Sequence, residues 1–66
     1  MTREKIIEVL SELYKELSMS PSEYAEYANE KYFHESGYKV VVDSAMAFRS
    51  GVVQERIKYL IREVKE

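Results

Sequence analysis

The chain lacks the residues from which small proteins usually build covalent or metal-bound supports. It has no cysteine, so no disulfide can form, and its single histidine cannot hold a structural zinc ion. In chains below about 70–80 residues, a core without such a support rarely contributes more than about 3–5 kcal/mol. At 66 residues, the sequence therefore predicts that self-association stabilises the fold, in a homodimer.

Long apolar runs are also missing. No stretch approaches the roughly 18 apolar residues that a membrane span needs, and the N-terminus has no basic-then-apolar signal pattern. The absence of cysteine is compatible with the reducing cytosol. The chain is 45% hydrophobic and 33% charged, which is typical of a folded globule rather than a disordered tail. We expect a single domain over residues 1–66, soluble and cytoplasmic, without membrane contact.

Motifs for catalysis or metal binding are scarce. Glu30 precedes His34 by four residues, but two ligands do not make a metal site and no nucleophile accompanies the histidine. Gly37 and Gly51 lie too far apart to build a phosphate-binding loop. We therefore expect no enzyme, no catalytic residues, no metal and no cofactor.

Apolar periodicity predicts a first helix from Glu4 to Leu17, with Thr2 as its N-cap. Apolar residues recur every three or four positions, which is the spacing of one buried helix face. Ile7 and Tyr14 widen this stripe on one side. Its members are Ile6, Val9, Leu10, Leu13 and Leu17.

Three neighbouring signals predict a second helix from Pro21 to about Glu35. Ser20 is a strong N-cap, Pro21 suits the first helical position, and Glu23 stands where a capping box needs it. Gly37 would close the helix in the left-handed conformation. The expected buried face consists of Tyr24, Ala25, Ala28 and Tyr32.

Tyr38–Asp43 contains the only β-branched run and predicts a strand. A lone strand needs a partner, either a hairpin strand over Ala45–Arg49 or the same strand of a second subunit. Ser50-Gly51 then predicts a break before a final helix over Val52–Lys65, and whether Ala45–Phe48 forms an earlier helical turn stays open. The expected fold is α+β and mostly helical, in the order helix-helix-strand-helix. Its segments are 1–36 (helical pair), 37–50 (strand and turn) and 51–66 (C-terminal helix).

Charge is distributed unevenly. Residues 1–37 hold four basic residues against eight glutamates, whereas residues 38–66 hold six basic against four acidic residues. Nucleic acid, if bound, should contact the C-terminal half; a solvated face of mixed charge is the simpler interpretation. The candidate nucleic-acid contacts are Lys39, Arg49, Lys58, Arg62 and Lys65, and the candidate protein interface is Tyr27, Phe33, Tyr38 and Val41.

The corner Leu-Ser-Met-Ser-Pro-Ser-Glu-Tyr joins two helices and is followed by alanines and aromatics. With this corner, the stretch Ile6–Phe33 resembles the helical pair of ribbon-helix-helix proteins. The resemblance implies a homodimer whose N-terminal strands read DNA. Only Met1–Lys5 precede the resembling stretch here, so that family's base-reading residues have no counterpart, and the resemblance favours a dimer more than DNA binding.

Two functions follow from these observations. The first is a small non-catalytic regulatory or interaction protein that acts as a homodimer through protein–protein contacts, with a protein partner that the sequence does not identify. The alternative is a dimeric DNA-binding transcriptional regulator that uses the basic C-terminal half.

Overall fold

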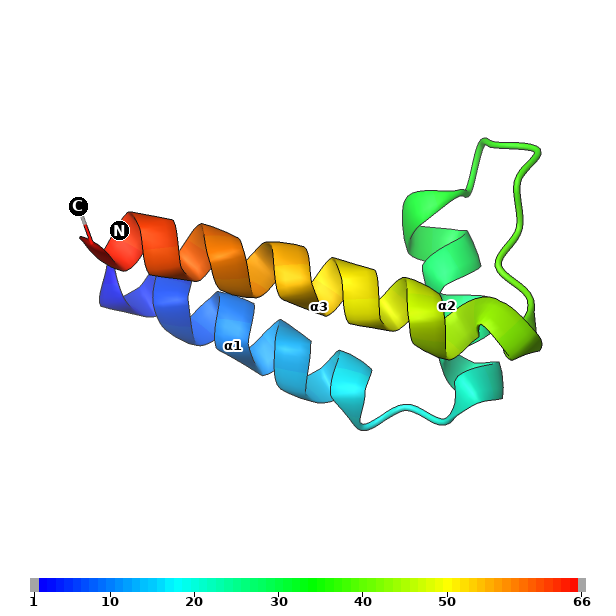
Figure 1. The fold of residues 1–66 in the computed structure, drawn as a ribbon, viewed down its shortest axis with the longest axis horizontal. Coiled ribbons are helices and arrows are strands. Elements are labelled where there is room, and N and C mark those ends of the chain that lie inside the picture. Colours follow the sequence, from blue (N-terminus) through cyan, green and yellow to red (C-terminus); the bar gives the residue numbers. More distant parts are fainter. Residues whose placement is uncertain (1, 66) are drawn as a thin grey trace.

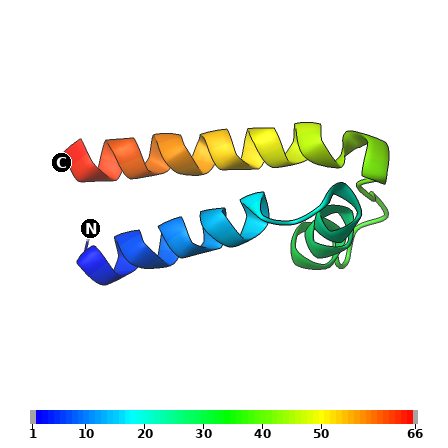
Figure 2. The same cartoon turned by 90° about the horizontal axis from the view of Figure 1, so that it is seen from below.

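The computed structural model describes residues 2–65, and its regular structure consists of three helices. These are α1 (Arg3–Leu17), α2 (Pro21–Tyr32) and α3 (Val42–Lys65). Helices α1 and α3 lie side by side and antiparallel, with both chain ends at one end of the pair (Figure 1). Helix α2 crosses the other end of α3, as the second view also shows (Figure 2).

The predicted starts of the first two helices are confirmed. The side chain of Thr2 accepts a hydrogen bond from the Lys5 backbone N–H at 3.2 Å. The hydroxyl of Ser20 accepts from the Glu23 backbone N–H at 3.2 Å, and the Glu23 carboxylate accepts from the Ser20 N–H at 2.9 Å. This reciprocal capping box satisfies donors that the first turn of α2 would otherwise leave unpaired.

Helix α2 ends at Tyr32, earlier than the sequence pattern predicts. Phe33 leaves the helical conformation, with φ −126° and ψ 22°, although its N–H still bonds to the Asn29 carbonyl. Its ring packs 5.4 Å from that of Phe48 and 4.8 Å from that of Tyr38, measured between centroids. The left-handed conformation expected at Gly37 is wrong, because neither glycine has a positive φ.

The predicted strand over Tyr38–Asp43 is wrong. Residues 2–65 contain three helices and no strand, so the fold is all-α rather than α+β. Tyr38–Val41 form an irregular connection, and Val42 and Asp43 already belong to α3. The side chain of Asn29 donates to the Val40 carbonyl at 3.0 Å and accepts from the Val40 N–H at 2.6 Å. One amide side chain therefore satisfies the buried backbone groups of Val40 that a neighbouring strand would otherwise pair.

The segmentation of the C-terminal half also changes. Gly51 lies inside the 24-residue α3, so the predicted break at Ser50-Gly51 and the hairpin strand at Ala45–Arg49 are both wrong. Segment 37–50 is a connection followed by helix, and Ala45–Phe48 form early turns of α3. Burial explains this, because Ala45 is fully buried and Phe48 packs against the core.

The core is concentrated where α2 crosses α3. Its small residues allow close approach of the backbones, and a surrounding group of aromatic and methionine side chains is partly buried. On α1, by contrast, Leu13 and Glu16 are buried. The rest of the α1–α3 pair is thus a two-helix layer beyond the main core. The core residues are Tyr24, Ala25, Ala28, Val40 and Ala45.

Candidate interaction surface

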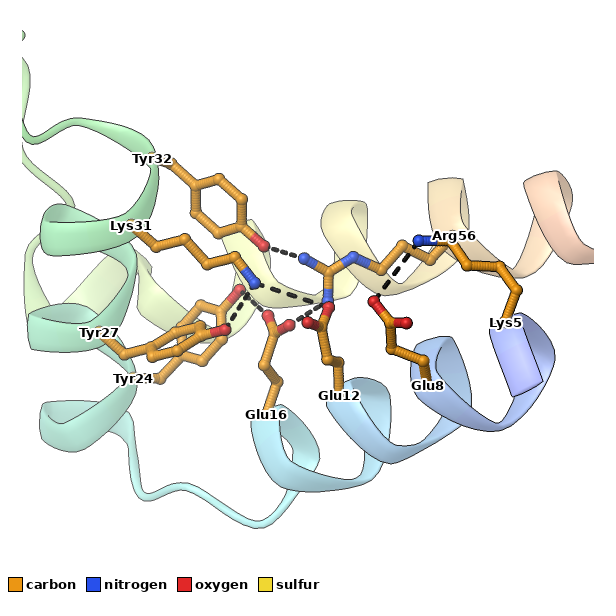
Figure 3. Close-up of polar contacts among 9 residues, drawn as sticks. All are labelled: Lys5, Glu8, Glu12, Glu16, Tyr24, Tyr27, Lys31, Tyr32 and Arg56. Carbon is orange, nitrogen blue, oxygen red and sulfur yellow. Dashed lines mark hydrogen bonds and ion pairs between the residues drawn. The ribbon is translucent and has the colours of Figure 1, made fainter.

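The α1–α3 pair has two different sides, set by which residues fall on each at 100° per residue. One side faces α2 and carries interacting polar groups, which Figure 3 shows together. We call it the polar side. The opposite side carries large apolar side chains and is not covered by α2. We call it the apolar face, and it consists of Ile7, Leu10, Tyr14, Leu17, Ile57, Ile61 and Val64.

The polar side centres on Glu16, whose side chain is fully buried. Its carboxylate accepts a hydrogen bond from the Tyr24 hydroxyl at 3.0 Å and an ion-paired hydrogen bond from the Arg56 guanidinium (Figure 3). The same guanidinium donates to the Tyr32 hydroxyl. Four side chains from all three helices therefore pair with one another, and no buried side-chain polar atom within residues 2–65 lacks a hydrogen-bond partner.

Burial and the Glu16 carboxylate raise pKa values within this network. Burial, followed by the hydrogen bond to Glu16, raises the pKa of the Tyr24 hydroxyl well above its ordinary value. Burial also raises the pKa of Tyr32. For Arg56, partial burial disfavours the charged form, but the hydrogen bond and charge of Glu16, together with Tyr32 and Glu12, raise the pKa of the guanidinium. Both phenols thus stay protonated at neutral pH, where the Tyr24 hydroxyl donates to Glu16 and the Tyr32 hydroxyl accepts from Arg56.

Two further cations join the helices. Arg49 donates to the carbonyls of Glu16 at 3.2 Å and Met19 at 3.1 Å, and so satisfies groups at the C-terminal end of α1. Lys31 donates to the Tyr27 hydroxyl at 2.9 Å, and its amine lies 3.7 Å from the Glu12 carboxylate (Figure 3). These contacts tie α1 to α3 and to α2 along the polar side.

The apolar face has no such partners. An open groove between the helices is lined by Ile6 and Leu10 from α1 and by Leu60, Ile61 and Val64 from α3. Its lining is almost wholly apolar. Exposed apolar residues at positions i, i+4 and i+7 continue it along both helices, which makes this contiguous exposed patch the candidate interaction surface. The two stripes are Leu10, Tyr14 and Leu17 (51%, 72% and 53% exposed) and Ile57, Ile61 and Val64 (44%, 52% and 64% exposed).

The five predicted nucleic-acid contacts do not form one surface. Lys58, Arg62 and Lys65 share the outer side of α3, where Lys58 lies 3.7 Å from the Glu55 carboxylate. Arg49 points inward and binds the end of α1. Lys39 lies in the α2–α3 connection, at the opposite end of α3 from Lys65.

The four predicted protein-interface residues are also divided. Tyr27 and Phe33 are half-buried against the core, whereas Tyr38 and Val41 are exposed on the connection. Sequence reasoning missed the apolar face as a site. The sequence signal for this face is the width of the apolar stripe of α1. With Ile7 and Tyr14 included, the stripe is wider than one neighbouring helix can cover.

Chemical groups for catalysis do not gather in the part of the chain that the structure describes. The Glu30 carboxylate lies 3.5 Å from His34 Nδ1, with both side chains largely exposed, and no cluster of three metal-ligating residues occurs in residues 2–65. Within the same range, no helix is both long and apolar enough to cross a membrane. No protein-family model, curated protein or solved structure matches the chain.

Proposed function

We propose that this chain is a non-catalytic interaction protein that acts as a homodimer, with the apolar face as the contact between two copies. The observation that carries the proposal is the exposure of seven large apolar side chains on one side of a long helix pair. Removing such surface from water contributes about 25 cal/mol per Å². The polar residues of the opposite side bond to one another in a structural network, which supports a non-catalytic role.

The shape of the face supports a second copy as its occupant. A face built from two antiparallel helices is complementary to itself, because two such layers stack into a four-helix bundle that buries both. The short chain, its lack of cysteine and its small core also favour self-association. A core shared between two copies buries more apolar surface and so adds stability that the small core of one chain lacks.

The dimensions of the apolar face determine how tightly we expect the two copies to bind. The 15 residues of α1 extend about 22 Å. Two helices side by side, each of about 10 Å diameter, therefore form a face with an area of roughly 400 Å². Two copies would bury roughly 800 Å² in total, somewhat below the about 1,000 Å² that a stable specific interface usually exceeds. The dimer should therefore dissociate measurably on dilution.

A pair of matched substitutions tests the proposal. Leu10→Glu places a charge in the face, whereas Val42→Glu makes the same change at an equally exposed residue outside it. By light scattering coupled to size exclusion, the unchanged chain and Val42→Glu should have twice the 7.8 kDa chain mass, and Leu10→Glu should have the single mass. Equal weakening by both substitutions, or a monomeric unchanged chain, would contradict the proposal.

The alternative is a dimeric DNA-binding regulator, and the stripe of Lys58, Arg62 and Lys65 on the outer side of α3 favours it. Such cations would bind phosphates, and affinity for mixed-sequence duplex DNA would then fall steeply with salt because counterions are released. The engagement of Arg49 within the chain leaves this hypothesis fewer contacts. An absence of binding at low salt would exclude it.

A further inference from the structure

The α1–α3 pair is packed unequally along its length. At the end nearer α2, Leu13 and Glu16 of α1 are buried. Toward the chain ends, segments 3–10 of α1 and 57–65 of α3 contain no buried side chain. We call these two segments the terminal arms, and both lie at the end of the pair away from α2 (Figure 1). Their packing is only partial, and their half-buried members are Ile6, Val9, Leu60 and Glu63.

Polar contacts between the helices are concentrated in the same way. The buried carboxylate of Glu16 and the guanidinium of Arg49 join the second half of α1 to the other two helices. Within the terminal arms, Lys5 pairs with Glu8 at 3.4 Å, a contact inside α1. No hydrogen bond or ion pair joins segment 3–10 to segment 57–65, so polar groups do not hold these two described segments together.

Open grooves flank the terminal arms on both sides of the pair. The groove on the apolar face runs between Leu10 of α1 and Ile61 of α3, among other residues. A second groove, on the polar side, is lined by Lys5 and Val9 of α1 and by Tyr59 of α3, among others. The arms therefore pack against one another only along the strip between the two grooves, and little apolar surface is removed from water there.

Helical segments of this length depend on packing for their stability. Each arm is shorter than the roughly 12–15 residues below which an isolated helix is marginal in water. Segments with few buried apolar side chains and few tertiary contacts open locally at a lower free energy than a core does. In a single chain, the terminal arms should therefore open more often than the region where α2 crosses α3.

We infer that dimerisation orders the terminal arms. In a single chain the arms open frequently, whereas in the dimer the second copy covers them and holds them helical. This inference rests on the proposed function, because most of the apolar face belongs to the arms. The second half of α1, with its contacts to α2 and α3, stays folded in both states. The side chains that the arms contribute to the apolar face are Ile7, Leu10, Ile57, Ile61 and Val64.

Amide hydrogen exchange, measured by mass spectrometry, tests the inference by comparing peptides from the terminal arms with peptides from α2. At concentrations where the chain is monomeric, the arms should be protected roughly tenfold less than α2. When the concentration rises from well below to well above the dissociation constant, exchange in the arms should slow roughly tenfold, because the fraction of monomer falls. Equal protection of the arms and α2 in the monomer would overturn the inference.

Matched substitutions separate the effect of dimerisation from the effect of concentration. Leu17 belongs to the apolar face but lies outside the arms, and Val42 is similarly exposed outside the face. In a Leu17→Glu chain, the arms should exchange rapidly even at concentrations that protect the arms of a Val42→Glu chain. Slow exchange in α2 of both chains would show that the fold is intact. Arms as slow as α2 in a monomeric Leu17→Glu chain would contradict the inference.

The outcomes separate the two proposals. If the unchanged chain reaches the dimer mass but exchange in the arms does not slow as it does so, the inference is wrong and the homodimer stands. If the unchanged chain is monomeric at every concentration, the homodimer itself is wrong and the inference falls with it.

Discussion

Replacing Arg56 with methionine probes the polar side most severely. Methionine keeps much of the aliphatic stem but removes the cation that pairs with the fully buried Glu16. The Glu16 carboxylate would keep the hydrogen bond from the Tyr24 hydroxyl and lose its ion pair. The Tyr32 hydroxyl would also lose the donor that the guanidinium supplies.

The expected loss of folding stability follows from the burial of the Glu16 carboxylate. Removing one partner of a buried ion pair typically costs about 3–5 kcal/mol, because it leaves an uncompensated charge. That loss equals the whole stability expected of a core this small. The Arg56→Met chain should therefore be largely unfolded where the unchanged chain is folded. A second change, Glu16→Gln, keeps an acceptor for Tyr24 and removes the buried charge, so the double variant should cost only about 1–3 kcal/mol.

Urea unfolding followed by far-ultraviolet circular dichroism measures these differences. All variants should be compared at one chain concentration, because dimerisation couples stability to concentration. Lys58→Met is the matched control, since it removes a cation from an exposed pair on the same helix and should change stability by no more than about 0.5 kcal/mol. A double variant no more stable than Arg56→Met alone would refute the reasoning from buried charge.

Three smaller perturbations test the local structure. Ser20→Ala should cost about 1 kcal/mol in thermal unfolding, because α2 loses its N-cap, and the neighbouring Ser22→Ala should cost much less. The Ser20 backbone N–H holds the pKa of Glu23 below its ordinary value of 4.5. The Glu23 carboxylate should therefore stabilise the fold fully above pH 4.5, and this stabilisation should be lost as the pH falls through the lowered pKa that Glu23 has in the folded chain. A Glu23→Gln chain should lack that part of the dependence of stability on acid pH. Asn29→Ala should cost about 1–3 kcal/mol and accelerate amide exchange at Val40, which would lose its partner; an unchanged exchange rate would contradict this.

The sequence predicts well what is determined locally. Thr2 and the Ser20–Glu23 capping box define helix starts through contacts three residues apart, and these starts are confirmed. The apolar periodicity of α1 likewise predicts its extent. Such features depend on neighbouring residues and need no knowledge of the tertiary structure.

Errors arose where distant residues decide the local structure. The valine run suggested a strand, but Asn29 pairs with the Val40 backbone from eleven positions away. Gly51 suggested a break, but it lies on an exposed part of a helix whose early turns pack into the core. Intrinsic preference is a weak guide where packing of this kind is available.

The site was only partly predictable for the same reason. Nothing in the sequence around Glu16 indicates its partner Arg56, which follows forty positions later. Arg49 was grouped with surface cations, although it binds the end of α1. The extra width of the α1 stripe is the one sequence signal of the apolar face, and the face as a whole emerges only when the two antiparallel helices are placed together.

Sedimentation equilibrium of the unchanged chain, over a wide range of concentrations, tests the central claim most directly. We expect the apparent mass to rise from 7.8 kDa towards twice that value as the concentration increases, and to stop there. A closed two-fold contact through the apolar face permits no further growth. A constant mass of one chain at all concentrations would contradict the claim that this face joins two copies.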